Sequence, residues 1–240
     1  MSRAPGERRE ELAAGLAAVR QRVETACEKA NRDPSELTVV VVTKTFPASD
    51  VVLLADLGVR DVGESRDQEA KPKVAECVAA AGPAASLRWH FVGRLQTNKA
   101  ASVASYAAVV HSVDRPKLVP ALSKGAVASE RTVQCLLQVS LDADPSRGGA
   151  LPADVAALGD TVASADGLEL RGVMAVAPMH QEPSAAFARL LEVSHRLREQ
   201  HAQADWVSAG MSGDLEQTVL VGATHLRVGS AVLGSRPRLG

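Results

Sequence analysis

The stretch LTVVVVTKTFPASD, residues Leu37 to Asp50, decides the fold of this chain. Its segment Thr38–Val42 consists of β-branched residues only, a run typical of a parallel strand that is buried on both faces. Lys44 follows the strand after a single residue. The sequence therefore places a strongly hydrated cation at the mouth of a dry core, and a function has to account for it.

The same alternation of strand and helix continues along the chain. A helix is expected from Gly6 to Asn31, because apolar residues recur there at every third or fourth position. Seven further apolar stretches predict strands, at residues 59–65, 87–93, 107–114, 131–142, 168–176, 205–211 and 224–234. Helices are expected between the strands, at residues 47–58, 66–82, 95–106, 115–126, 152–164, 183–200 and 213–222.

Eight strands that alternate with helices predict an α/β fold, a single (β/α)8 TIM barrel. We expect one domain over residues 1–240, with the barrel at 37–234 and residues 6–31 as an extra N-terminal helix under the barrel or beside it. An open, doubly wound sheet is the alternative. A dinucleotide-binding sheet of that kind needs a GxGxxG turn after its first strand, and the sequence has none there.

Composition excludes several classes of function. The net charge of −1 offers no general attraction to nucleic acid or to an anionic membrane, so neither is expected as a partner. Cys27, Cys77 and Cys135 stand far apart and are expected to be reduced, buried thiols of a cytoplasmic protein. The N-terminus has no apolar signal core, and no segment is long and apolar enough to span a membrane. The histidine spacing predicts no metal site.

Three features fall at the carboxyl ends of strands, where barrels of this kind carry their active sites. They are Lys44, the loop SAGMSGD at 208–214 and the segment RVGSA at 227–231. The eighth strand of a closed barrel neighbours both the seventh and the first, so we expect the three to converge. The two Gly/Ser loops suit a phosphate, because glycine lets backbone N–H groups approach an anion. The natural donors are Ser212, Gly213, Gly229 and Ser230, although either loop could be only a tight turn.

Arg227 and Lys44 add chemistry to these loops. A guanidinium must find an acceptor, and for Arg227 this is either a carboxylate such as Glu64 or Asp214, or a ligand. Lys44 has its own ordinary interpretation, a solvated or ion-paired lysine at a strand end. Among valines, however, desolvation lowers the pKa of an amine and leaves it able to attack an aldehyde. An amine beside a phosphate site predicts a phosphorylated aldehyde, held by a sugar-phosphate aldolase or by a protein that binds pyridoxal phosphate.

At this point the sequence resembles a known family, the pyridoxal phosphate homeostasis proteins (YggS/PROSC family). The resemblance rests on motifs that run in order over residues 13–234. They are VTKTFP at 42–47, GESRDQEAKPK at 63–73, WHFVGRLQTNK at 89–99, VHSVD at 110–114, LRGVMAV at 170–176, GMSGDLE at 210–216 and LRVGSAVLG at 226–234. Two of them, WHFVGRLQTNK and GMSGDLE, are long and specific.

The resemblance implies a barrel like the N-terminal domain of alanine racemase, with pyridoxal 5'-phosphate as cofactor. It implies that Lys44 forms a covalent imine and that Arg227 faces the pyridine nitrogen. Further cofactor-binding residues follow from it: Ser212, Gly213, Gly229 and Ser230 hold the phosphate, Ser208 and Met211 flank that site, and Asn98 lies on the same rim. Two positions depart from the family pattern, because Ser65 replaces a usual asparagine and Ser230 a common threonine.

The resemblance also bears on catalysis, and no catalytic residue is assigned. Arginine cannot accept a hydrogen bond from a protonated pyridine nitrogen, so the ring is expected to stay unprotonated and to be a poor electron sink. The alanine racemases take a second acid/base, a tyrosine, from a further domain, which we do not expect here; the one tyrosine of the chain is Tyr106.

We therefore expect a non-enzymatic protein of intracellular pyridoxal phosphate homeostasis and delivery. It would contact pyridoxal-phosphate-dependent apoenzymes transiently and exist as a monomer or weak homodimer. The alternatives are a racemase-like enzyme of low activity and a Schiff-base aldolase.

Overall fold

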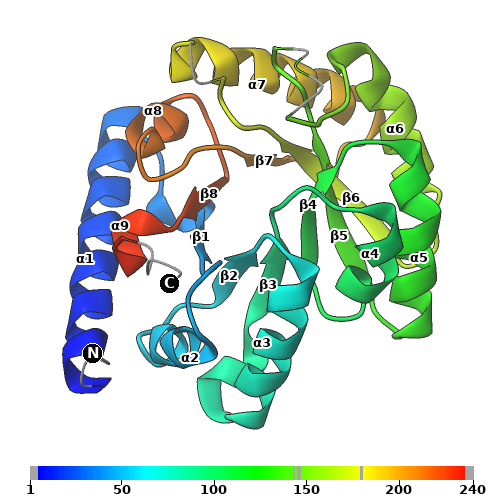
Figure 1. Cartoon of the computed structure of the whole chain (residues 1–240). Helices are drawn as coiled ribbons and strands as arrows, with labels where there is room; N and C mark the ends of the chain where they lie inside the picture. Colours follow the sequence, from blue (N-terminus) through cyan, green and yellow to red (C-terminus); the bar gives the residue numbers. More distant parts are fainter. Residues whose placement is uncertain (1–4, 143, 145–146, 179–180, 236–240) are drawn as a thin grey trace.

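Eight parallel strands close into a barrel in the order of the sequence, with β1 pairing to β8 (Figure 1). The computed structural model describes residues 5–142, 144, 147–178 and 181–235. The strands are β1 (Thr38–Val42), β2 (Asp61–Glu64), β3 (Arg88–Phe91), β4 (Val109–Val113), β5 (Val133–Gln138), β6 (Leu168–Met174), β7 (Trp206–Ser208) and β8 (His225–Val228). The expected (β/α)8 barrel is confirmed.

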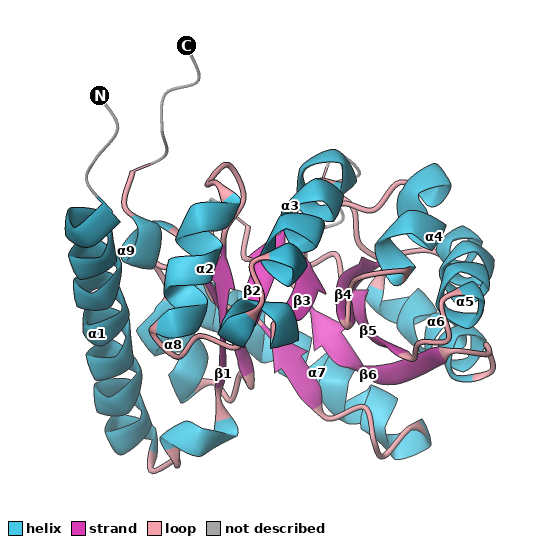
Figure 2. Ribbon diagram, turned by 90° about the horizontal axis from the view of Figure 1, so that it is seen from below, coloured by secondary structure: helices cyan, strands magenta, loops and turns pink. Residues whose placement is uncertain are grey.

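The helices form an outer layer around the strands (Figure 2). They are α1 (Pro5–Ala30), α2 (Ala48–Asp56), α3 (Asp67–Ala79), α4 (Thr97–Ala104), α5 (Val119–Ala128), α6 (Val155–Ala163), α7 (Pro183–Gln200), α8 (Leu215–Leu220) and α9 (Ser230–Leu233). Short 3-10 turns, η1 (Pro34–Glu36), η2 (Gly82–Ser86), η3 (Pro116–Leu118) and η4 (Pro152–Asp154), precede some of them. Within the described residues, none of the helices has the length and apolar character that a membrane span requires.

The helix α1 lies beside the barrel and completes the outer layer. It packs against α8, α9 and α2, along one edge of the molecule in Figure 1. A Cβ at Gly15 would lie 2.5 Å from the carbonyl oxygen of Val232, so only glycine permits this approach of α1 to α9. The helix α9 after β8 has a single turn. The apolar face of α1, with the buried residues Leu12, Leu16, Val19 and Val23, packs against α9 and its neighbours α8 and α2.

The apolar core and the barrel interior have different chemistry. Most of the core lies in one cluster of buried apolar side chains between strands and helices. The interior of the barrel also holds buried polar groups, and His90, His111 and His225 lie close together there, with ring centroids 5.1 to 6.4 Å apart. This polar interior leads to the carboxyl ends of the strands, where two cavities open.

Candidate functional site

A cavity of about 390 Å³ lies over the carboxyl ends of β1, β7 and β8. This volume falls in the range of roughly 300–1,000 Å³ that is usual for small-molecule sites. It brings together seven of the nine residues expected to hold the cofactor: Lys44, Met211, Ser212, Gly213, Arg227, Gly229 and Ser230. Ser208 bonds to Arg227 without lining the cavity itself, whereas Asn98 lines a second cavity over β2 to β4.

The loop that carries Lys44 is strained next to the lysine. Thr45 has a φ of 70°, a left-handed conformation that a β-branched residue rarely adopts and that costs about 1–3 kcal/mol. Its backbone N–H donates a hydrogen bond to the carboxylate of Glu69 on α3. The strain therefore persists because a neighbouring helix holds the loop.

A buried lysine on α3 completes this clamp. The Nζ of Lys73 donates to the carbonyl oxygen of Thr43 at 3.0 Å, to Glu64 at 2.6 Å and to Glu69 at 3.0 Å. Burial raises the pKa of Glu64, although the charge of Lys73 opposes that shift. This cluster was not predicted from the sequence. Its signal was a lysine on the buried face of a helix, in line with Ala70 and Cys77, where a solvated lysine has no place.

The two glycine-containing loops are tied to each other and to α1. The backbone N–H of Ala231 donates to the Oγ of Ser212 at 3.3 Å, which links the loop after β7 to the loop after β8. Arg22 donates to the carbonyl oxygen of Ser212 at 3.0 Å and forms an ion pair with Glu216 at 2.6 Å. The N-terminal helix therefore positions the loops in which phosphate binding was expected.

The loops leave hydrogen-bond donors available on the cavity side. Among the described residues, none accepts a hydrogen bond from the backbone N–H of Ser212, Gly213 or Ser230. A Cβ added at Gly213 would meet no atom within 4 Å, so there is room over this residue. No carboxylate is found among the described residues that line the cavity. Backbone donors without acceptors, in a cavity whose wall also carries Lys44 and Arg227, suit a negatively charged ligand.

Arg227 lies at the base of the cavity with 6% of its surface exposed. It donates to the Oγ of Ser208 at 2.6 Å and to the carbonyl oxygen of Ala175 at 2.8 Å. Neither of the carboxylates weighed as its partner forms an ion pair with it in the described structure, because Glu64 pairs with Lys73 and Asp214 caps the N–H of Met211 at 2.5 Å. The guanidinium keeps unused N–H donors, since it has five and these bonds use two.

Burial governs the charge of this arginine. It lowers the pKa of Arg227 to about 10, against the stabilising charge of Asp214, so the group remains protonated at neutral pH. Because the unperturbed pKa is 12.5, the fold holds this cation in place at a cost of about 3 kcal/mol. A desolvated cation at the base of a cavity is a candidate for ligand binding.

A continuous chain of hydrogen bonds crosses the barrel below Arg227. Ser208 Oγ lies 2.9 Å from His111 Nδ1, and His111 Nε2 lies 2.8 Å from His90 Nδ1. His90 Nε2 in turn lies 2.9 Å from Asp61, at the amino end of β2. This chain of hydrogen bonds joins residues of four strands and was not predicted from the sequence.

The groups at the two ends of this chain of hydrogen bonds, Arg227 and Asp61, determine which group donates and which accepts in each bond. Arginine only donates, so the Ser208 hydroxyl accepts from Arg227 and gives its own hydrogen to His111. Burial lowers the pKa of both His90 and His111, so both rings are neutral. Burial is the largest influence on Asp61 and opposes its ionisation, but the hydrogen bond with His90 and nearby positive charge such as that of Arg88 together outweigh it, and the pKa of Asp61 is lowered. The carboxylate therefore accepts from His90, which accepts from His111.

Comparison with known proteins places the chain among characterised relatives. The family model "Alanine racemase, N-terminal domain" matches residues 15–237. The pyridoxal phosphate homeostasis protein of Mycobacterium tuberculosis H37Rv is 44% identical over 245 aligned positions, which cover 96% of this chain and 95% of the relative. The protein of the same name from Escherichia coli K12 is 31% identical and covers 94% of this chain and 97% of its own.

Solved structures agree with this placement. PipY of Synechococcus elongatus PCC7942, solved with PLP bound, has a TM-score of 0.80 at 31% identity and covers 93% of this chain and 100% of its own. Alanine racemase from Corynebacterium glutamicum has a TM-score of 0.67 at 13% identity, covering 97% of this chain and 62% of that protein. At that identity the likeness concerns the fold alone.

Proposed function

The chain belongs to the family of the pyridoxal phosphate homeostasis proteins, and on that premise we propose that it binds pyridoxal 5'-phosphate (PLP) over β1, β7 and β8 and serves PLP homeostasis and delivery. One observation carries this proposal. Lys44, Arg227 and the backbone N–H groups without acceptors line a single cavity, in which no carboxylate is found among the described residues.

Each part of PLP has a matching group in the chain. The phosphate is a dianion and suits the N–H groups of Ser212, Gly213 and Ser230. The pyridine nitrogen is an acceptor and suits the unused donors of Arg227. PLP itself supplies an aldehyde and an electron-withdrawing ring. Lys44 is the amine that attaches the cofactor as a covalent imine, on a loop that the cluster around Lys73 clamps to α3.

The site is that of a carrier without efficient catalysis. The protonated guanidinium of Arg227 donates a hydrogen bond and cannot accept one from a ring N–H, so the ring nitrogen stays unprotonated and the ring is a weak electron sink. Apart from Lys44, the described side chains that line the cavity include no histidine, tyrosine, cysteine or carboxylate to act as a second acid or base. Tyr106 lies elsewhere and donates to Asp67, and burial raises the pKa of its hydroxyl.

Handover is the purpose of such a carrier. We propose transient contact with PLP-dependent apoenzymes, by a monomer or weak homodimer in the cytoplasm. Reduced thiols suit that compartment, and Cys27, Cys77 and Cys135 are free and buried. The alternative is a racemase-like enzyme of low activity, which exchange of the alanine α-proton with solvent would reveal.

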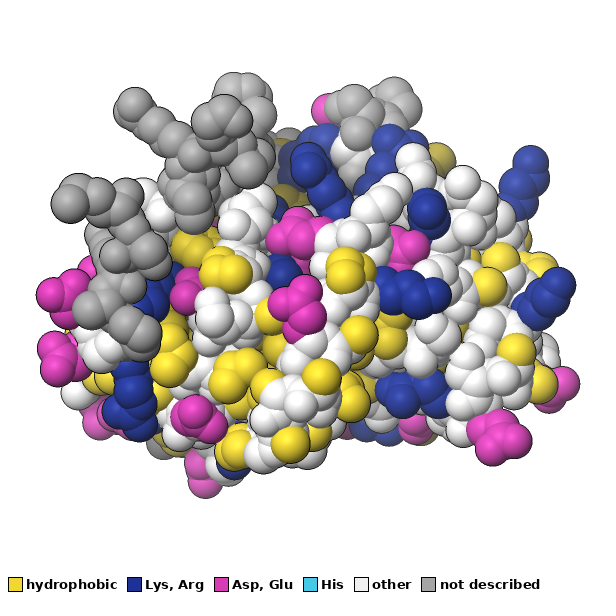
Figure 3. Space-filling view, turned by 60° about the horizontal axis from the view of Figure 1, so that its bottom comes forward, with side chains coloured by type: hydrophobic (Ala, Val, Ile, Leu, Met, Phe, Trp, Pro, Cys, Tyr) yellow, Lys and Arg dark blue, Asp and Glu magenta, His cyan; other side chains and the backbone are white. Residues whose placement is uncertain are grey.

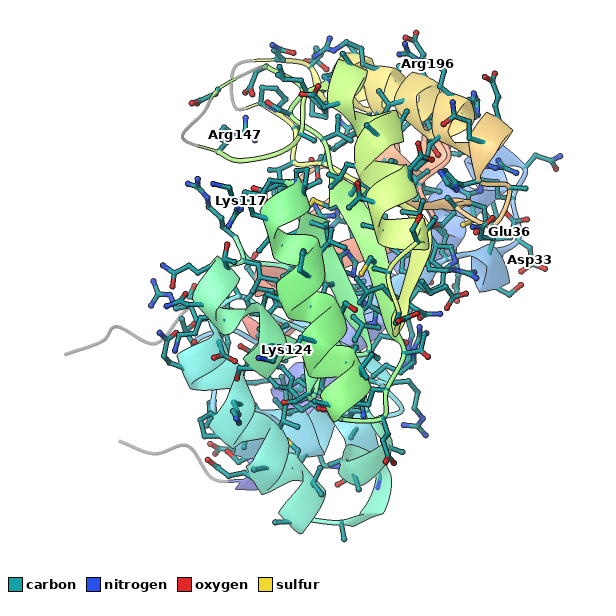
Figure 4. The ribbon with its side chains drawn as sticks, turned by 90° about the vertical axis from the view of Figure 1, so that its right-hand side faces the viewer. Asp33, Glu36, Lys117, Lys124, Arg147 and Arg196 are labelled. Atoms are coloured by element: carbon teal, nitrogen blue, oxygen red, sulfur yellow. The ribbon has the colours of Figure 1, made fainter. Side chains whose placement is uncertain are left out.

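The experiment is a spectrum of the purified protein before and after borohydride, followed by mass analysis of the trapped adduct. Lys44→Ala is expected to abolish both the near-visible imine band and the adduct, with the barrel still folded. Lys124→Ala is the control, because Lys124 stands on the outside of α5 (Figure 4). An adduct that persists in Lys44→Ala would move the attachment to another lysine and overturn the assignment.

A further inference from the structure

A second, larger cavity of about 840 Å³ opens at the same end of the barrel, over β2, β3 and β4. The segments after these three strands form its wall. It lies next to the first cavity, because Val92 lines the first while its neighbours Phe91 and Arg94 line the second. None of the residues assigned to the phosphate, ring nitrogen or aldehyde of PLP contributes to it.

The wall of this second cavity is strongly basic. Arg66, Arg94, Lys99 and Arg115 line it, against a single lining carboxylate, Asp67. Figure 3 shows basic side chains gathered in the upper part of the view, where the carboxyl end of the barrel comes into sight. Asp67 accepts from Ser102 at 3.0 Å and from Tyr106, and it forms an ion pair with Lys99 at 3.9 Å. This carboxylate therefore offsets only one of the four cations that line the wall.

Two of these arginines are uncommitted. Arg66 and Arg94 are exposed and make no side-chain hydrogen bond or ion pair with any residue that the structure describes. They come from different loops, after β2 and after β3, yet face one hollow. Unpaired guanidinium groups that converge from separate loops present planar donor forks of the kind that bind phosphate oxygens in pairs.

The other parts of the wall are fixed. A Cβ at Gly93 would lie 2.1 Å from the carbonyl oxygen of Ser65, so the loops after β2 and β3 touch through their backbones. Arg115 donates to Asp114 at 2.5 Å and to the carbonyl oxygen of Leu95 at 3.0 Å, which ties β4 to the same loop. A rigid wall that carries two free arginines is organised for a ligand.

The remaining lining selects the class of ligand. Neutral hydrogen-bonding side chains, Gln68, Gln96, Thr97 and Asn98, surround the cations, and α4 begins at Thr97 without a side-chain cap. The apolar lining residues Phe91 and Leu95 are buried, so they offer little surface for stacking a base or an acyl chain. We propose that the second cavity binds the phosphate group of a small phosphorylated molecule without a covalent bond, through Arg66 and Arg94.

The test first fills the neighbouring cavity with PLP and reduces the protein with borohydride. Inorganic phosphate and pyridoxamine 5'-phosphate, which has no aldehyde, are then titrated by calorimetry, with the charge-matched Lys124→Met variant as control. We expect one phosphate per chain, bound about tenfold more weakly in Arg66→Met or Arg94→Met and about a hundredfold more weakly in the double variant. Both side chains are exposed, so the variants are expected to fold.

Each outcome of these titrations either supports or overturns the proposed phosphate site. Equal affinity for both probes supports a site that reads the phosphate alone, and tighter binding of the vitamer supports a site for a second B6 molecule. No binding up to about 10 mM, or binding that survives the double substitution, overturns the proposal. A double variant that binds phosphate normally but transfers PLP to apoenzymes slowly also overturns the proposal. In that case Arg66 and Arg94 would belong to a surface that contacts the apoenzyme. A failure of PLP to attach in the first cavity is detected separately, because the protein then gains no mass after reduction with borohydride.

Discussion

Two arginine sites at one end of the barrel handle positive charge in opposite ways. Arg227 is buried, bonded to Ser208 and Ala175, and connected by neutral groups to a carboxylate at the far end of the barrel. Arg66 and Arg94 are exposed and have no partner among the described residues. Hydrogen bonds to Ser208 and Ala175 fix the side chain of Arg227. Within the described structure, the side chains of Arg66 and Arg94 are placed only by the loops that carry them.

The difference teaches where selectivity resides. Burying and orienting a charged donor lowers the stability of the fold. Such a donor distinguishes a ring nitrogen from water, because it forms its hydrogen bond without a change in the position of the protein groups around it. Exposed guanidinium groups cost little and attract anions generally, yet salt screens them with a Debye length of roughly 10 Å at 0.1 M. The first cavity therefore suits retention of one cofactor, and the second suits weak, reversible binding.

Removing the buried arginine is the largest test of this contrast. Arg227→Met is expected to weaken PLP binding by about 10–100-fold, through loss of a charged hydrogen bond. The unfolding free energy of the apoprotein is expected not to fall, because the substitution also removes the desolvation cost of about 3 kcal/mol. Cofactor titration and urea unfolding measure the two quantities.

Arg196→Met is the matched control for that experiment. Arg196 stands on the outside of α7 (Figure 4) and lines neither cavity. A surface change of this kind alters the unfolding free energy by less than about 0.5 kcal/mol. If Arg227→Met bound PLP as the wild type does, Arg227 would be a purely structural group and the contrast between the two sites would disappear.

Interrupting the chain beneath Arg227 is expected to have the next largest effect. Asparagine is too short to reach both His90 and Ser208, so His111→Asn leaves at least one buried polar group without a partner. The expected loss is about 1–3 kcal/mol of unfolding free energy. The imine absorption should also broaden as Arg227 loses its fixed position. His195→Asn on the exposed face of α7 is the control, and equal stability of both variants would argue against a connected chain.

The pH dependence of stability tests a third histidine of the barrel interior. Burial lowers the pKa of His225 to about 3, from 6.5. The unfolded chain takes up a proton near pH 6.5 while the folded ring remains neutral, so its contribution is complete above that pH and is lost as the pH falls toward 3. In His225→Leu the slope of unfolding free energy with pH should fall by about 1.4 kcal/mol per pH unit between about pH 4 and 6. An unchanged slope would mean that the folded barrel protonates His225 at ordinary pH.

Much of the site could be predicted from local sequence. The loop 208–214 and the segment 227–231 were expected to converge with Lys44, and residues of both line one cavity with it, because β8 pairs with β1 and with β7 in a closed barrel. The position of Asn98 was less predictable. It stands on the same end of the barrel but lines the second cavity, because the loop after β3 lies on the other side of Val92.

By itself, the sequence determined the periodic pattern of this protein. The run Thr38–Val42 became β1, and the segment Pro183–Gln200 became α7 with the expected bounds, because buried runs and helical periodicity depend on neighbours along the chain. Tertiary structure alone decided which charged groups met. Lys73 forms an ion pair with Glu64, and Arg227 donates hydrogen bonds to Ser208 and to the carbonyl oxygen of Ala175. Such partners come from other strands and helices, and only the closure and register of the barrel set their distances.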